Sequence, residues 1–253
     1  MLLAIDVGNT ATIIGLWNEE ELLQRWRIAT DAMRMESEYV ALLHQLFAFA
    51  GLASPDAAIV SSVVPPVELE LSAALQTLFG VAPVVVSAAN SGLQVDIDNP
   101  REVGADRLVN AVAALQYHDR RGRYVVVDFG TAATFDLVEE PGIYRGGAIA
   151  PGPRTAAEAL SSKTAKLPRV DLSRAPESPL GRSTTQALQA GLVLGYASLV
   201  DGMVKRFLDA SGDALVIATG GFSRVIEPVC RYLEVVDPDL TLKGLRLIWE
   251  KSA

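Results

Sequence analysis

The sequence predicts an α/β protein built from two related halves, and two observations support this prediction. The first is an internal repeat, because residues 2–13 and 124–135 each read as an apolar strand, an Asp-x-Gly turn and a second apolar strand. Asp6 and Asp128 hold the same place in the two copies and lie 122 positions apart, close to half of the 253 residues. The second is that short apolar runs alternate with stretches of helical periodicity. We therefore predict one mixed β-sheet flanked by helices in each half.

The predicted elements follow a similar order in both halves. Each half opens with three strands, at 2–6, 11–17 and 22–28 and again at 123–128, 132–138 and 143–149. The first half continues with a helix over 36–50, a strand at 57–61, a helix over 66–79, a strand at 84–86 and a helix over 103–117. The second half continues with helices over 153–161 and 183–210, a strand at 214–218, a further helix and a last helix over 240–250. Loops rich in Pro and Gly fall at 88–100, 139–153 and 166–182. We place the two domains at 1–115 and 116–253.

Composition and charge exclude several classes of function. The chain has 22 Lys and Arg against 30 Asp and Glu, and this net charge of −8 argues against a general nucleic-acid binder. Its one cysteine, Cys230, rules out an internal disulfide and a Cys-rich zinc site, and reads as a half-buried thiol. Two histidines leave little material for a Ser-His-Asp or Cys-His hydrolase. We find no apolar span of about 20 residues and no secretory leader, so we expect a cytoplasmic protein without a membrane partner.

The two Asp-x-Gly turns carry residues that suit phosphate binding. A carboxylate at the end of a buried strand needs a cation or hydrogen-bond donors. Glycine lets the backbone approach a ligand closely, and Thr or Asn adds hydroxyl or amide donors. The first turn supplies Asp6, Gly8, Asn9, Thr10 and Thr12, and the second supplies Asp128, Gly130, Thr131 and Thr134. The alternative interpretation, two ordinary hairpin turns, is favoured by one copy alone but not by two copies together with a third glycine turn.

Two further segments extend this pattern. Gly220 and Gly221 follow a buried strand and open a helix, and paired glycines let a base or ribose lie against the backbone. Gly104 precedes Asp106 and Arg107 at the start of another helix, where free N–H groups favour anions. Arg107 can clamp a carboxylate, and Asp106 can accept a proton from a hydroxyl. A simple helix N-cap is an equally valid role for Asp106. These turns together predict a nucleotide cleft between the halves.

Taken in order, these segments resemble the type III pantothenate kinases of the acetate and sugar kinase/Hsp70/actin superfamily. The matching segments are 6–12, 98–107, 127–131, 146–152, 164–168, 191–202 and 218–221. The resemblance extends from Met1 to Glu250, and the combination of motifs is specific although each motif alone is not. It implies two ribonuclease-H-like (actin-like ATPase) domains with the nucleotide cleft between them. The implied reaction is ATP-dependent phosphorylation of pantothenate to 4'-phosphopantothenate, the first step of coenzyme A biosynthesis.

The resemblance also implies roles for individual residues. Asp106 is the implied catalytic proton acceptor. The implied pantothenate contacts are Gly104, Ala105, Asp106, Arg107, Ile97 and Thr184. Thr184 would reach the site from the second subunit of a homodimer formed by the helix over 185–209, although that helix is equally consistent with a buried core helix. The implied ATP contacts are Asp6, Val7, Gly8, Asn9, Thr10, Ala11, Thr12, Ile13, Thr131, Gly220 and Gly221. Asp6 would act through Mg²⁺ on ATP, and Asp128 would bind a monovalent cation, K⁺ or NH₄⁺.

The sequence departs from the family pattern at several positions, and two alternative functions stay open for this reason. Ala133 stands where a threonine is common, and Ile97 stands where a tyrosine often lines the substrate site. Residues 88–93 and 181–184 also differ from the family's segments. The alternatives are a kinase of the same fold for a different small alcohol or sugar, and a non-catalytic nucleotide-binding descendant. Because Asp6, Asp106 and Asp128 are all present, we expect an active enzyme.

Overall fold

The computed structural model describes residues 1–164 and 166–252 and divides the chain into two compact units. Unit 1 contains residues 1–93 and 98–113 together with the segment from 241 onward, and unit 2 contains residues 94–97 and 114–240. The chain therefore passes from one unit to the other at four points. The boundary expected at 115/116 lies next to one of them, but the last helix groups with unit 1 and residues 94–97 with unit 2.

Unit 1 is built on a five-stranded mixed sheet in the order β3-β2-β1-β4-β5. Its strands are β1 (Leu2–Val7), β2 (Ala11–Asn18), β3 (Glu21–Ala29), β4 (Ala57–Ser62) and β5 (Val84–Val85). Strands β1 to β3 form an antiparallel meander, whereas β4 pairs with β1 in parallel. The register sets Asp6 opposite Ser61 and Val7 opposite Ser62. The carboxyl ends of β1 and β4 therefore meet at one edge of the sheet.

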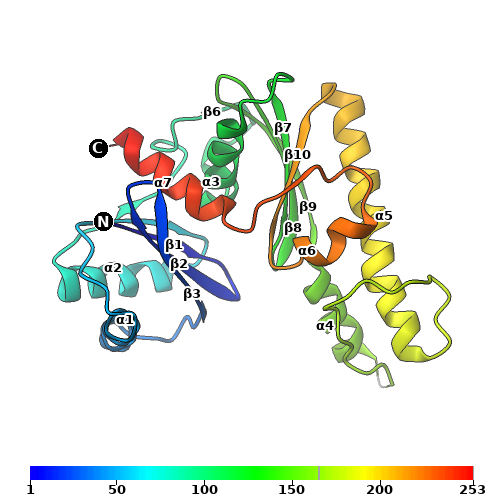
Figure 1. Ribbon diagram of the computed structural model, residues 1–253, viewed down its shortest axis with the longest axis horizontal. Coiled ribbons are helices and arrows are strands. Elements are labelled where there is room, and N and C mark those ends of the chain that lie inside the picture. The colour runs from blue at the N-terminus through cyan, green and yellow to red at the C-terminus, as the bar shows by residue number, and fades with distance from the viewer. Residues whose placement is uncertain (165, 253) are drawn as a thin grey trace. The chain divides into compact units, whose positions relative to one another are not determined.

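Helices cover both faces of this sheet (Figure 1). Helices α1 (Glu36–Ala50) and α2 (Pro65–Phe79) pack with Leu3 and Ile5 in one apolar cluster. Helices α3 (Ala105–Ala114) and α7 (Leu240–Ser252) pack with Leu2 and Ala4 in another. Because neighbouring residues of β1 point to opposite faces, this strand is buried on both sides. A near-continuous apolar strand of this kind is typical of a sheet enclosed by helices.

Unit 2 is built on a six-stranded mixed sheet in the order β11-β10-β7-β8-β9-β6. Its strands are β6 (Gln94–Val95), β7 (Arg123–Phe129), β8 (Ala132–Glu139), β9 (Ile143–Pro151), β10 (Leu215–Gly220) and β11 (Val235–Val236). Strands β7 to β9 repeat the antiparallel meander of unit 1, and β10 pairs with β7 in parallel. The register sets Thr219 opposite Asp128 and Gly220 opposite Phe129. The predicted α/β class with a mixed sheet in each half is confirmed.

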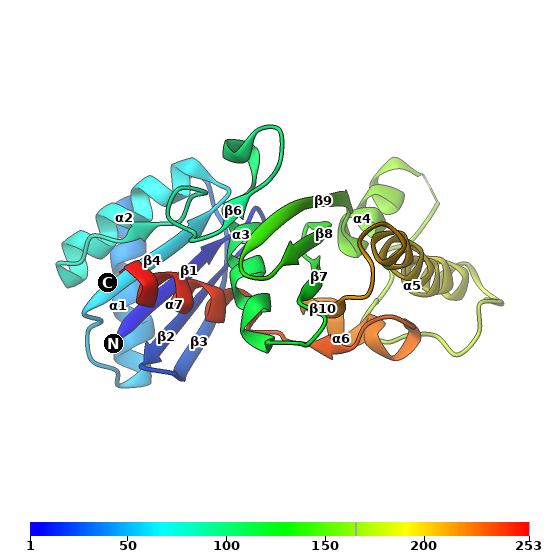
Figure 2. The same cartoon turned by 90° about the horizontal axis from the view of Figure 1, so that it is seen from above.

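Within its described residues, unit 2 contains the helices α4 (Pro153–Lys163), α5 (Thr184–Ser211) and the short α6 (Ser223–Ile226). Helix α5 covers one face of the sheet, where Val193 and Val200 join Val125 and Phe135 in the main apolar cluster. Figure 2 shows α4 beside α5, and the two helices are in contact. Short turns of 3₁₀ helix lie at 100–102, 115–117 and 227–229.

Helix α5 corrects one expectation drawn from the sequence. Its 28 residues contain a window of mean hydropathy 1.4, so by length and composition it qualifies as a membrane span, contrary to the expectation that no such segment exists. In the structure 39% of that window is buried, and Val193, Val200 and Val204 lie in the core of unit 2. A core helix of a soluble protein passes the same test, so α5 is weak evidence for a membrane segment.

The sequence does not predict the two short strands β6 and β11, whereas the further helix expected after the strand at 214–218 is α6. Strand β6 lies inside the segment 88–100 that the sequence marks as a loop, and it pairs with β9 over two residues. Strand β11 likewise pairs with β10 over two residues. Periodicity does not reveal elements of this length, because a two-residue strand spans only one alternation of side chains. Residue Ala165 of the predicted segment 164–168 lies outside the described residues.

Candidate active site

Asp6 stands near the carboxyl end of β1, and the turn that follows is closed by a backbone hydrogen bond. The N–H of Gly8 donates to the carbonyl of Ala11 at 3.1 Å. A Cβ on Gly8 would lie only 3.1 Å from the same carbonyl oxygen, so a larger residue would force the turn to shift. Asn9 and Thr10 at the tip are exposed, and Asp6 is half-buried. The turn therefore presents two of the predicted donors to solvent.

Thr30, which follows β3, fixes this turn, although no sequence motif points to it. Its hydroxyl donates to the carbonyl of Gly8 at 2.7 Å and lies 2.9 Å from the hydroxyl of Thr12. Its N–H donates to the carbonyl of Thr10 at 3.1 Å. Because Thr30 has one hydroxyl proton and gives it to Gly8, Thr12 must donate in the bond between the two threonines. Thr12 is completely buried, so it supports the turn from within the unit.

The loop that leads into α3, the helix in which Asp106 is the second residue, lies at the same edge of unit 1 as the Asp6 turn. Val63, the residue after β4, donates its N–H to the carbonyl of Val7 at 3.1 Å. A Cβ on Gly104 would lie 3.7 Å from the side chain of Val63. The segment leading into α3 is therefore adjacent to the carboxyl ends of β1 and β4. Open α/β sheets bind their ligands at this edge.

Gly104 and Asp106 form a tight start to α3. The N–H of Arg107 donates to the carbonyl of Gly104 at 3.1 Å and to Oδ1 of Asp106 at 2.8 Å. A Cβ on Gly104 would lie 2.5 Å from Oδ1 of Asp106, so this carboxylate position requires glycine at 104. Asp106 is the second residue of α3 and accepts the N–H of the residue that follows it, so it is not the N-cap that the alternative interpretation expected.

The surroundings of Asp106 raise the pKa of its carboxyl above the ordinary value. Burial is the largest cause, because it disfavours the charged form. The backbone N–H and the positive charge of Arg107 act in the opposite direction and lower the pKa. A carboxylate whose pKa lies above the usual range is a stronger base, so this environment suits a proton acceptor.

In unit 2, Asp128 and Gly220 meet at the carboxyl ends of β7 and β10. Gly220 has φ +86°, and a Cβ there would overlap Oδ1 of Asp128 and lie 2.6 Å from the N of Phe129. The carbonyl of Gly220 accepts a hydrogen bond from the hydroxyl of Ser223 at 2.8 Å. A Cβ on Gly221, by contrast, would meet open space. The first glycine of the pair is thus the one that the local geometry demands.

The Asp-x-Gly turn of unit 2 presents Thr131 and is held by the start of α4. Thr131 is exposed, and its carbonyl accepts hydrogen bonds from the N–H of Gly152 at 2.9 Å and from the hydroxyl of Thr155 at 2.6 Å. Ala133 is completely buried in the apolar cluster of the unit. The departure from the family's threonine at this position therefore removes a hydroxyl from the core and not from the exposed part of the turn.

Ile97 and Thr184 belong to two other segments of unit 2. Ile97 follows β6, and its side chain lies 3.3 Å from the place that a Cβ on Gly146 would take. Thr184 is exposed and begins α5, where Ser183 serves as N-cap and accepts a hydrogen bond from the N–H of Gln186 at 3.2 Å. The structure thus gathers Asp6, Gly104 and Asp106 in unit 1 and Asp128, Thr131 and Gly220 in unit 2.

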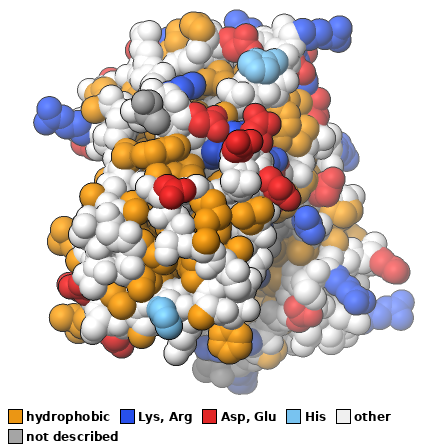
Figure 3. Space-filling view, turned by 60° about the vertical axis from the view of Figure 1, so that its left-hand side comes forward, with side chains coloured by type: hydrophobic (Ala, Val, Ile, Leu, Met, Phe, Trp, Pro, Cys, Tyr) orange, Lys and Arg blue, Asp and Glu red, His pale blue; other side chains and the backbone are white. Residues whose placement is uncertain are grey.

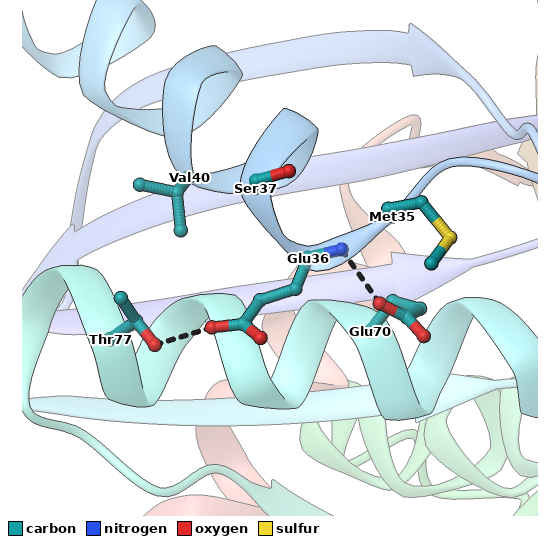
Figure 4. A pocket seen from close by; sticks show the side chains of 6 residues that line it. All are labelled: Met35, Glu36, Ser37, Val40, Glu70 and Thr77. Carbon is teal, nitrogen blue, oxygen red and sulfur yellow. Dashed lines mark hydrogen bonds between the residues drawn. The ribbon is translucent and has the colours of Figure 1, made fainter.

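A pocket of about 410 Å³ lies between α1 and α2 of unit 1, apart from these turns (Figure 4). It is lined by Met35, Glu36, Ser37, Val40, Glu70 and Thr77. The hydroxyl of Thr77 donates to Glu36 at 2.5 Å, and the N–H of Glu36 donates to Glu70 at 2.6 Å. Two carboxylates on its wall repel phosphate, and none of the predicted site residues lines it. The pocket is therefore not a candidate ATP site.

The donor set fits a metal ion that is held jointly with phosphate. Within residues 1–164 and 166–252, no three His, Cys, Asp or Glu side chains gather so as to hold a metal by themselves. Asp6 and Asp128 each supply one half-buried carboxylate beside a turn with exposed hydroxyl or amide groups. Mg²⁺ is usually bound through one or two carboxylates, substrate phosphates and several waters, so a single carboxylate is sufficient.

Replacing Gly220 with alanine tests whether the glycine turn shapes the site. In Gly220→Ala the new methyl group must displace the Asp128 carboxylate or the Phe129 backbone, and φ +86° strains any non-glycine residue. We expect the affinity for Mg-ATP, measured by calorimetry, to fall about 5- to 150-fold, because holding the turn in its binding conformation then costs about 1–3 kcal/mol. Gly221→Ala is the matched variant and should lose far less. Equal affinities of the two variants would contradict this role of Gly220.

Comparisons with known proteins agree with these observations. The family model for type III pantothenate kinase matches residues 2–206. A type III pantothenate kinase of Thermus thermophilus is 61% identical over 245 residues, 97% of each chain, and one of Exiguobacterium sibiricum is 46% identical over 255 residues, 100% of each chain. A solved ROK family glucokinase from Streptomyces griseus shares the fold with a TM-score of 0.57 at 12% identity, covering 99% of this chain and 98% of that one. A ROK hexokinase from Thermus thermophilus does so with a TM-score of 0.52 at 11% identity, covering 100% and 99%. The predicted ribonuclease-H-like fold is confirmed, and the chain belongs to the type III pantothenate kinase family.

Proposed function

We propose that this protein transfers the γ-phosphoryl group of ATP to the primary hydroxyl of pantothenate, the first step of coenzyme A biosynthesis. The observation that carries the proposal is the placement of Asp106 in unit 1. This carboxyl has a raised pKa and lies at the sheet edge where the Asp6 turn also ends. Family membership supports pantothenate as the molecule that accepts the phosphoryl group. At the sheet edge, the Asp6 turn binds phosphate and Asp106 accepts the proton.

Asp106 orients the pantothenate hydroxyl and accepts its proton as the phosphoryl group is transferred. Phosphoryl transfer depends mainly on positioning and charge neutralisation, so a carboxylate that holds one hydroxyl in line is sufficient as a base. Gly104 and Ala105 form the wall of this subsite, and Arg107 binds the pantothenate carboxylate through its guanidinium group. Ile97 contributes an apolar contact in place of the family's tyrosine.

The two Asp-x-Gly turns and the glycine pair bind ATP. The turn over 6–13 holds phosphate oxygens through its backbone N–H groups and through Asn9 and Thr10, while Thr131 makes a further contact. Gly220 and Gly221 bind the nucleoside part. Asp6 holds Mg²⁺ together with the phosphates, and Asp128 holds a monovalent cation, K⁺ or NH₄⁺. When bound, these cations neutralise negative charge on the phosphate groups.

The proposed assembly is a homodimer in which α5 forms the interface and Thr184 contacts pantothenate in the partner's site. The buried side of α5 packs in the core of unit 2, but its other side is exposed. Gly191, Gly195 and Gly202 on that side have open space around them, and Leu199 is 37% exposed. Small residues allow two helices to approach closely, so a second copy of α5 fits here. We place the protein in the cytoplasm.

Asp106→Asn tests the proposed reaction directly. The amide keeps the size of the side chain but cannot accept a proton, so we expect kcat to fall at least about a hundredfold while ATP affinity is retained. Asp98→Asn, at an exposed aspartate on the loop before α3, is the matched control and should keep its rate. ADP release is measured with Mg-ATP, K⁺ and pantothenate, and in parallel with a panel of alcohols and sugars. Activity on another acceptor alone would favour a different kinase, and binding without turnover would favour a non-catalytic descendant.

The raised pKa of Asp106 predicts the acid limb of the pH profile. The base works in its deprotonated form, so kcat/KM for pantothenate falls as pH drops through this pKa. Because burial raises the pKa, the fall should begin at higher pH than for an exposed aspartate. Arg107→Gln removes the positive charge that lowers this pKa, so its acid limb should move to still higher pH. An acid limb that is unchanged in Arg107→Gln would show that Asp106 does not set it.

Mixed dimers test the contribution of Thr184. Asp106→Asn and Thr184→Ala should each be impaired, because each lacks one residue of the site. When the two variants are refolded together, a heterodimer contains one site with both Asp106 and Thr184 if Thr184 acts across the interface. Pantothenate-dependent activity should then reappear above that of either variant alone. If Thr184 acts within its own chain, no heterodimer site is complete and no activity returns.

A further inference from the structure

The start of α4 braces the Thr131 turn with two hydrogen bonds to one oxygen. The N–H of Gly152 and the hydroxyl of Thr155 both donate to the carbonyl of Thr131, at 2.9 and 2.6 Å. A carbonyl oxygen has two lone pairs, so both acceptor positions are used. The peptide that joins Thr131 to the next residue is planar, and two bonds to its oxygen therefore fix the direction of that plane.

The Thr155 bond differs from those of the other hydroxyls around α4. Serine and threonine hydroxyls in helices commonly bond a carbonyl three or four residues earlier in the same helix. Ser161, Ser162 and Thr164 do so, with Glu158, Ala159 and Leu160 as their acceptors. The hydroxyl of Thr155 instead reaches a carbonyl 24 positions away. This hydroxyl is therefore used to hold the turn and not to support the helix.

Gly152 and Pro153 fix the position of Thr155 in the first turn of α4. Gly152 is buried against the turn, and a Cβ there would overlap the carbonyl of Gly130 and lie 2.5 Å from that of Thr131. Pro153 begins the helix, where its fixed φ suits the first helical position. The close approach of Gly152 and the rigid first residue together set where the first turn of α4 lies. Thr155 is consequently held within hydrogen-bond distance of Thr131.

The internal repeat supplies an independent argument for this brace. Thr30, which braces the turn of unit 1, has Gly152 as its counterpart 122 positions later. Both residues follow the third strand of the meander and donate an N–H to the turn, to Thr10 in unit 1 and to Thr131 in unit 2. Thr30 also donates its own hydroxyl to the turn, at Gly8. Gly152 has none, and Thr155 supplies the second donor from the first turn of α4.

We propose that Thr155 is a positioning residue for ATP binding, which acts by fixing the Thr131 turn through its hydroxyl. The proposal rests on the proposed function, which assigns Thr131 a contact with ATP. Thr155 does not itself contact the nucleotide. Its hydroxyl holds the Thr131 turn in the conformation that binds ATP, so binding does not have to order the turn.

Three variants test the proposal. Thr155→Val removes the hydroxyl and keeps the shape, Thr155→Ser keeps a hydroxyl, and Ser161→Ala removes a hydroxyl that bonds within the same helix. The dissociation constant of Mg-ATP is measured by calorimetry without an acceptor. We expect Thr155→Val to weaken binding about fivefold, because one hydrogen bond is lost, and the other two variants to stay within about twofold of the unchanged protein. Thr155→Ala gives the same comparison if Thr155→Val does not fold.

Two further measurements separate positioning from general destabilisation. Thermal unfolding and the KM for pantothenate should be nearly the same in Thr155→Val and Ser161→Ala. Equal ATP affinities in Thr155→Val and the unchanged protein would overturn the proposal. So would a loss of ATP affinity that Ser161→Ala shares, or a pantothenate KM that rises in parallel with the loss of ATP affinity. Absence of pantothenate turnover in the unchanged protein would instead overturn the proposed function, while the ATP affinities would still test Thr155.

Discussion

Parallel pairing of the first strand of each unit with a later strand is the constraint on which both candidate turns depend. The β1–β4 ladder sets Asp6 opposite Ser61, and the β7–β10 ladder sets Asp128 opposite Thr219. Each ladder brings the carboxyl ends of two strands to one edge, where backbone groups are no longer used by the sheet. In unit 1 the loop before α3 packs on the residue after β4, so Asp106 reaches the same edge. Burial of β1 on both faces holds this alignment in place.

The two turns show that a repeated sequence can support related geometry with different side chains. In unit 1 a single residue, Thr30, bonds the turn through both its N–H and its hydroxyl. In unit 2 the corresponding residue is Gly152, which comes so close to the turn that no side chain fits. The hydroxyl then comes from Thr155 in the first turn of α4, a helix that has no counterpart directly after β3. In unit 2 the backbone at Gly152 therefore lies close to the turn, and this position lacks the side chain that Thr30 has in unit 1.

Much of the fold follows from the sequence, because apolar periodicity reports burial directly. The helix expected over 36–50 is α1, and the expected strands of both meanders appear within one or two residues of their bounds. Strands β6 and β11 are invisible to this reasoning, because each pairs over only two residues. The C-terminal helix was assigned to the second half by its place in the chain. It packs instead with α3, because Gly244 allows α7 to approach Val109.

The sequence predicts a residue of the candidate site only where that residue lies in a recognisable motif. Asp6, Asp106 and Asp128 lie in segments whose residue types suggest their chemistry. The structure places Asp6 and Asp128 beside a glycine turn near a strand end, and Asp106 at the start of α3, two residues after Gly104. Thr30 and Thr155 lie outside those segments. Their hydroxyls bond carbonyls that are 22 and 24 positions away, so no local motif reveals their role. Ala133 shows the opposite case, since it departs from the family motif but its side chain lies in the core. A motif therefore marks a segment, and only the register of the sheet shows which of its side chains reach the surface.

The net charge of −8 limits how such a protein can bind a polyanion. On the face shown in Figure 3, acidic side chains gather in the upper part, and Lys and Arg lie mostly toward the margin. Long-range attraction therefore contributes little, and phosphate must be held by short-range donors at fixed positions. Short-range donors are effective only when they are already oriented, because ordering them on binding costs conformational entropy. This requirement explains why threonines that bond the turn backbone and close-packed glycines lie around both turns. Loss of a hydroxyl behind a turn should therefore reduce affinity, as loss of a hydroxyl that faces the ligand does.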